Sequence, residues 1–110
     1  MDAKLLFIKA PHLIYKSDLD KQPLGGWIYC GTSVDLQTPL LEDGINACFP
    51  DEELYFIRTR IDSQVANKRT SLSLIKQHID VDTIILFSKD FKVVIEFGDN
   101  GVFRSGRVHQ

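Results

Sequence analysis

The fold is decided by residues 83–108, which read TIILFSKDFKVVIEFGDNGVFRSGRV. Two polar turns, at residues 89–90 and 98–101, divide this stretch into three short runs of apolar and β-branched residues. Such residues favour strands, whereas Asp, Asn and Gly tolerate the positive φ angles that hairpin turns require. The stretch therefore predicts a three-stranded antiparallel meander.

The first two runs are expected to lie differently in the sheet. Residues 84–87 are apolar on both faces, which is typical of a central strand covered on both sides. In the second run every other residue is apolar and faces one side: Phe91, Val93, Ile95 and Phe97. A strand with this alternation buries one face only.

Upstream, apolar and β-branched runs predict three further strands. A Thr38-Pro39 pair is typical of a helix start, and Leu41, Ile45 and Phe49 would share one face of that helix. Residues 71–79 predict a second helix, while 62–70 fit either a loop or the start of that helix. The expected upstream strands are residues 4–9, 27–34 and 54–61, with Gly31 marking a bulge or a close backbone approach. Residues 12–15 could continue the first of these as a second short strand.

These segments predict one α+β domain spanning residues 1–110. It would have two layers: a mainly antiparallel sheet of five or six strands, with one or two helices on one face and the meander at its C-terminal end. The expected order is β-β-α-β-α-β-β-β.

Composition narrows the functional classes. Apolar residues make up 44% of the chain and charged residues 25%, as in ordinary globular proteins. No apolar run approaches the roughly 20 residues of a membrane span, and the start of the chain lacks a secretory signal, so a cytoplasmic protein is expected. Cys30 and Cys48 are then expected as free thiols. The three histidines show no metal-binding spacing, and neither a metal nor another cofactor is expected.

Charge is distributed unevenly along the chain. Residues 1–55 carry four lysines and nine acidic residues, a net charge of −5, whereas residues 56–110 carry a net charge of +3. A nucleic-acid-binding protein would need a strong basic excess, which is missing here. The acidic half favours a basic protein as the partner, because complementary charge speeds association.

The leading hypothesis is therefore a small protein-binding domain without catalytic activity. Compact single-domain inhibitors, such as immunity proteins that neutralise a toxin, have this general profile. Aromatic residues would anchor the interface and carboxylates would steer the partner. The predicted partner-binding residues are Trp27, Tyr29, Asp35, Glu42, Asp43, Asp51, Glu52 and Glu53.

Two alternatives stay open. The first is a small ribonuclease-like hydrolase in which His12 or His78 would act with Arg58 and Arg60 in one cleft, since two histidines beside a cation suit acid–base cleavage of RNA. The second is a structural subunit that self-associates by strand pairing at an exposed edge of the meander.

Overall fold

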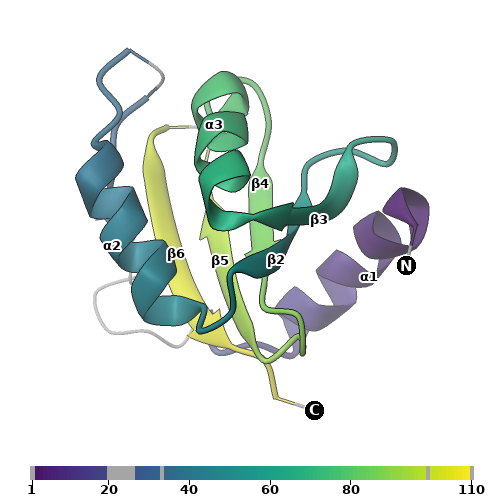
Figure 1. The fold of residues 1–110 in the computed structure, drawn as a ribbon. Coiled ribbons are helices and arrows are strands. Elements are labelled where there is room, and N and C mark those ends of the chain that lie inside the picture. The colour runs from purple at the N-terminus through teal and green to yellow at the C-terminus, as the bar shows by residue number, and fades with distance from the viewer. Residues whose placement is uncertain (1, 20–26, 33, 99, 110) are drawn as a thin grey trace.

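The computed structural model describes residues 2–19, 27–32, 34–98 and 100–109. These parts of the chain form three helices and six strands (Figure 1). Their order is α1 (Ala3–Tyr15), β1 (Ile28–Tyr29), α2 (Thr38–Cys48), β2 (Glu53–Ile57), β3 (Ser63–Asn67), α3 (Lys68–His78), β4 (Ile84–Phe87), β5 (Val93–Phe97) and β6 (Val102–Arg107).

The strands form one antiparallel sheet in the order β1-β6-β5-β4-β2-β3. The predicted α+β class and the C-terminal meander β4-β5-β6 are confirmed. On one side of the meander β4 pairs with β2, and on the other side β1 pairs with β6 at Val102 and Phe103. The turn between β5 and β6 closes with the N–H of Gly98 donating to the carbonyl of Val102, and Gly101 has the expected positive φ of 82°. Asp99, which we also expected in this turn, lies outside the described residues.

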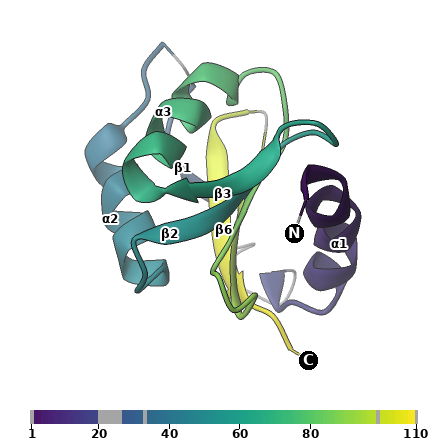
Figure 2. The same ribbon diagram turned by 45° about the vertical axis from the view of Figure 1, so that its right-hand side comes forward.

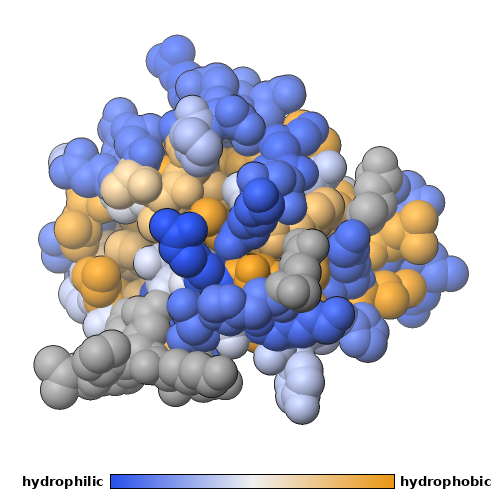
Figure 3. Space-filling model, turned by 90° about the horizontal axis from the view of Figure 1, so that it is seen from below, coloured by the Kyte–Doolittle hydropathy of each residue, from blue (hydrophilic) through white to orange (hydrophobic). Residues whose placement is uncertain are grey.

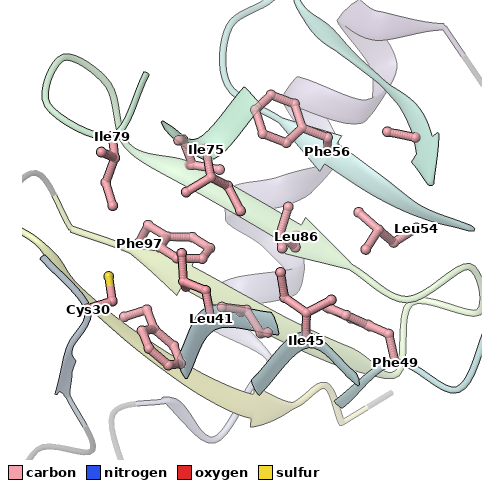
Figure 4. Packing of buried hydrophobic residues seen from close by; sticks show 14 residues of the cluster. Cys30, Leu41, Ile45, Phe49, Leu54, Phe56, Ile75, Ile79, Leu86 and Phe97 are labelled. Atoms are coloured by element: carbon pink, nitrogen blue, oxygen red, sulfur yellow. The ribbon is translucent and has the colours of Figure 1, made fainter. Parts of the chain in front are cut away.

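The larger hydrophobic core lies between the sheet and the helices α2 and α3 (Figure 4). Pro39 stands in the first turn of α2, where its fixed φ suits a helix. The predicted stripe of this helix is confirmed, because Leu41, Ile45 and Phe49 are each 1% exposed. The α3 helix begins at Lys68, earlier than expected, because the side chain of Asn67 caps it by accepting from the N–H of Thr70.

The other face of the sheet is covered by α1 (Figure 2). The strands predicted at residues 4–9 and 12–15 were therefore wrong. Leu6, Ala10 and Leu13 form the buried stripe, yet Leu5 and Ile8 on the outer side are 54% and 46% exposed. Because apolar residues lie on both sides of this helix, its sequence lacks the contrast between an apolar and a polar face. The 3.6-residue period that identifies a helix is therefore not visible in the sequence.

A helix is nevertheless specified locally at this end of the chain. The side chain of Asp2 caps α1 by accepting from the N–H of Leu5 at 2.9 Å. Pro11, which we expected to break a strand, lies inside the helix. It lacks the N–H that would bond the carbonyl four residues earlier, so burial of the inner stripe must offset that loss.

Strands β4 and β5 have the predicted registers apart from Phe91, but the expectation that β5 buries one face only was wrong, because Val94 on its other face is fully buried against the α1 side. Ile84 and Leu86 face the larger core while Ile85 and Phe87 face α1, as expected for a covered central strand. Phe91 was predicted to face the same side as Ile95 and Phe97, which was wrong. It precedes β5 in a turn with φ of 59°, and its ring stacks on Tyr55 on the α1 side at 4.7 Å.

Two other element boundaries differ from the prediction, and one strand was missed. The strand expected at 27–34 contains only Ile28 and Tyr29, since Gly31 turns the chain with φ of 90°. A Cβ at Gly31 would lie 2.6 Å from the carbonyl oxygen of Asp35, which confirms the predicted close approach. The strand expected at 54–61 ends at Ile57, and β3 was missed because its sequence, SQVAN, is mostly polar.

Candidate partner-binding surface

Five of the predicted carboxylates lie on α2 and on the segment that leads from it to the first residue of β2. We call Glu42, Asp43, Asp51, Glu52 and Glu53 the acidic corner; all five are exposed. No described residue forms a hydrogen bond or an ion pair with any of these five side chains. In contrast, several carboxylates elsewhere accept a hydrogen bond from a described residue: Asp2, Asp18, Asp35, Asp62, Asp82, Asp90 and Glu96.

A groove of about 440 Å³ runs between α2 and the first turns of α3. Its lining contains two carboxylates, Glu42 and Glu52, and two cations, Lys68 and Arg69. Leu72 supplies apolar surface, and Asn46 and Ser73 complete the lining. The backbone N–H of Lys68 donates to the carbonyl of Glu52 at 3.0 Å, so these two residues are neighbours within the groove. The groove therefore offers charges of both signs around an apolar residue.

Asp35 is separate from the acidic corner, because its carboxylate is used within its own loop. It accepts from the backbone N–H of Thr32 at 2.8 Å, from the hydroxyl of Thr32 and from the hydroxyl of Tyr29. These bonds, above all the one from the Thr32 backbone, lower the pKa of Asp35. The hydrogen bond to Asp35 in turn raises the pKa of Tyr29. The carboxylate thus stabilises the loop between β1 and α2.

The two predicted aromatic anchors lie on the other face of the sheet. Ile28 pairs with Phe103, which faces the larger core, so Tyr29 points to the α1 side together with Val102. The guanidinium of Arg104 stands 4.3 Å from the ring centre of Trp27. Trp27 and Tyr29 are 42% and 51% exposed, but the structure does not bring them together with the acidic corner.

The residues of the hydrolase hypothesis are dispersed. His12 lies on α1 and His78 on α3, and these helices pack on opposite faces of the sheet (Figure 2). Arg58 binds Asp82 at 2.5 Å and Asp62 at 2.7 Å, which raises the pKa of its guanidinium. Arg60 is exposed in the turn between β2 and β3.

The thiols and potential metal ligands offer no further site. Both cysteines are free, and burial raises the pKa of Cys30 to about 11. Within the described ranges, no group of three or more His, Cys, Asp or Glu side chains could hold a metal ion. The described helices include none with the length and apolar character needed to cross a membrane.

Sequence reasoning missed the basic and apolar side of the groove. Residues 62–70 were treated as a loop or an uncertain helix start, so Lys68 and Arg69 were not placed on a helix beside Glu42. The available signal was Asn67, a strong N-cap residue directly before them.

Comparison with known proteins adds no family, since no family model, curated protein or solved structure matches this chain.

Proposed function

We propose that this protein is a non-catalytic protein-binding domain that docks a basic partner on the acidic corner and the adjoining groove. The observation that carries the proposal is that all five carboxylates of the corner lack a partner among the described residues. Exposed charges of one sign contribute little to the stability of a fold, but they steer an oppositely charged partner and raise its association rate.

The groove would supply specificity to this encounter. A basic side chain of the partner would meet Glu42 and Glu52, while an acidic or amide group would meet Lys68 or Arg69. Leu72 gives the partner a small apolar contact at the centre of these charges. A partner with the wrong charge order would place like charges together, which costs affinity.

Small inhibitors of a toxin or an enzyme, including immunity proteins, use this combination of a compact fold and a charged docking face. We extend the proposal to that class by analogy of size and charge alone. We place the activity in the cytoplasm, because two free cysteines are typical of proteins in a reducing compartment.

The test begins with chemical cross-linking in the native host to isolate the partner. Its association rate is then measured at low salt with the wild type and with the triple variant Glu42→Gln, Asp43→Asn, Glu52→Gln. We expect the association rate to fall about tenfold in this variant, because the steering charge is lost. Thermal unfolding should be unchanged within about 0.5 kcal/mol, since all three positions are exposed.

The matched control raises the net charge by the same amount elsewhere, with Ile61→Lys, Gln64→Lys and Val81→Lys. These side chains are exposed and lie in the β2–β3 turn, in β3 and after α3. The control should associate faster than the triple variant. Equal rates for the wild type and the triple variant at low salt would refute the acidic corner as the docking site.

A further inference from the structure

The outer side of α1 carries an apolar stripe that the fold itself does not use. Leu5, Ile8 and Tyr15 are 54%, 46% and 90% exposed, and His12 between them is exposed as well. Their spacing of three, four and three residues places all four on one side of a helix with 3.6 residues per turn. Figure 3 shows apolar surface among hydrophilic side chains on the side of the molecule where α1 lies in Figure 1.

Lysines border this stripe on both sides. At the helical period, Lys4 lies on one side, and Lys9 and Lys16 lie on the other. Lys4 and Lys16 are exposed, whereas Lys9 is half-buried with its ammonium 4.4 Å from the ring centre of Phe91. The α1 helix has no acidic residue of its own. An apolar stripe between cations is complementary to an apolar stripe between carboxylates.

A cavity of about 280 Å³ opens beside the same helix. Phe7, Ala10 and Pro11 form its α1 wall, and the sheet side is lined by Ile57, Arg58, Thr83 and Ile85. The charge of Arg58 is compensated by Asp62 and Asp82, so the cavity presents a largely apolar interior. Its volume lies just below that of a typical small-molecule site, and suits one large apolar side chain of a docked partner.

From these three observations we propose that α1 is a second docking surface, which binds an acidic amphipathic helix of a partner protein. The partner helix would lay its apolar residues along Leu5, Ile8, His12 and Tyr15, and its carboxylates would face Lys4 and Lys16. This stripe is as narrow as the seam of a coiled coil, and helices that insert into a membrane surface have a broader apolar face. The surface lies on the opposite side of the sheet from the acidic corner, so it does not depend on the function proposed above.

The probes are two short synthetic helical peptides with leucine at the a and d positions of each heptad. One carries glutamate and the other lysine at the e and g positions, so that like charges keep each peptide from self-pairing. Binding to the full chain is measured by fluorescence anisotropy at low salt. We expect the glutamate peptide to bind at least tenfold more tightly than the lysine peptide. Affinity should be modest, because one short helix buries less surface than a standard protein interface.

Two variants assign the binding to α1. The double variant Ile8→Ser, Tyr15→Ser should weaken the glutamate peptide at least tenfold, and Lys4→Glu with Lys16→Glu should reverse the preference between the peptides. A control pair, Ile61→Ser and Val81→Ser, removes side chains that are 92% and 75% exposed elsewhere and should leave binding unchanged. Circular dichroism checks that each variant keeps its fold.

Four outcomes would overturn the proposal. They are the absence of binding to either peptide, equal binding of both peptides, and binding that the α1 variants do not affect. The fourth is a different occupant: co-sedimentation with phosphatidylserine vesicles, or a dimer mass in sedimentation equilibrium, that is lost in the Ile8→Ser, Tyr15→Ser variant.

Discussion

The two faces of the sheet are covered in different ways. On one face α2 and α3 bury a large apolar cluster, and the outer surface near α2 is acidic. On the other face a single helix, α1, covers a smaller cluster and turns Leu5, Ile8 and Tyr15 outward between lysines. A helix with one apolar stripe only closes a core, whereas a helix with two stripes can close a core and still bind something else. The following predictions test whether the two layers differ in this way.

The largest effect is expected from the same truncation made on each face. Leu86 and Leu6 are both fully buried: Leu86 lies on β4 in the cluster under α2 and α3, and Leu6 lies on α1 and faces the sheet. Leu86→Ala should lower the free energy of unfolding by about 4 kcal/mol, and Leu6→Ala by about 2–3 kcal/mol, since α1 can shift towards the sheet and partly close the cavity. Urea denaturation measures both values. A loss for Leu6→Ala as large as that for Leu86→Ala would show that the α1 layer is as rigid as the other.

A smaller effect is expected from the two prolines of the covering helices. Pro11→Ala should stabilise the protein by about 1–3 kcal/mol, because alanine supplies the missing N–H in the interior of α1. Pro39→Ala should instead destabilise it by about 0.5 kcal/mol, because proline is favourable in the first turn of α2. Thermal unfolding of both variants shows whether each substitution raises or lowers the stability. If Pro11→Ala is destabilising, its packing beside the cavity matters more than the lost hydrogen bond.

The smallest effect concerns the thiols, and it leaves the fold unchanged. Cys30 is fully buried with a pKa near 11, so at pH 8 only about one molecule in a thousand carries the thiolate. Cys48 is half-buried and lines a cavity with Ala47 and Ser105. Iodoacetamide at pH 8 should therefore label Cys48 alone, and Cys30 only in denaturant, as mass spectrometry of the labelled peptides would show.

The raised pKa of Cys30 also determines whether its contribution to the stability of the fold rises or falls with pH. The folded state holds the thiol proton more tightly than the unfolded state, whose thiol titrates near its ordinary pKa of 9.0. The contribution of Cys30 to stability is thus complete below pH 9 and is lost as the pH rises towards 11. The variant Cys30→Ala should lose less stability than the wild type over this interval. If the stability of the wild type and of the variant changes with pH in the same way, the pH effect does not come from Cys30.

How far the sequence predicted the fold depended on whether one pattern dominated each segment. Residues 84–87 were correctly placed because a short apolar run between polar turns is typical of a covered strand. The stripe Leu41, Ile45 and Phe49 was correctly placed because no other pattern competed with its helical spacing. The α1 segment was misassigned because apolar residues on both sides of the helix concealed its period. The β3 strand was missed because it is a polar edge strand whose position is set by pairing with β2.

Which residues meet on the surface was harder to predict than the fold, because it depends on contacts between segments that are distant in the sequence. The acidic run 51–53 was visible in the sequence, but its approach to Lys68 and Arg69 depends on how α2 and α3 pack. Likewise, Arg58 was predicted as a site residue of a hydrolase, and only the tertiary structure brings Asp82 to it from the segment after α3. Contacts between distant segments are not encoded in local spacing.

The position of α1 at the beginning of the described chain has a consequence for biosynthesis. Its inner stripe packs in one cluster with Phe87, Val94 and Val108, which lie far downstream in the sequence and are synthesised after the helix. At roughly 5–20 residues per second, this helix would wait roughly 5–20 s without its sheet. During that interval both of its apolar sides are open to the cell, so the nascent chain offers a target to chaperones before the inner side is buried.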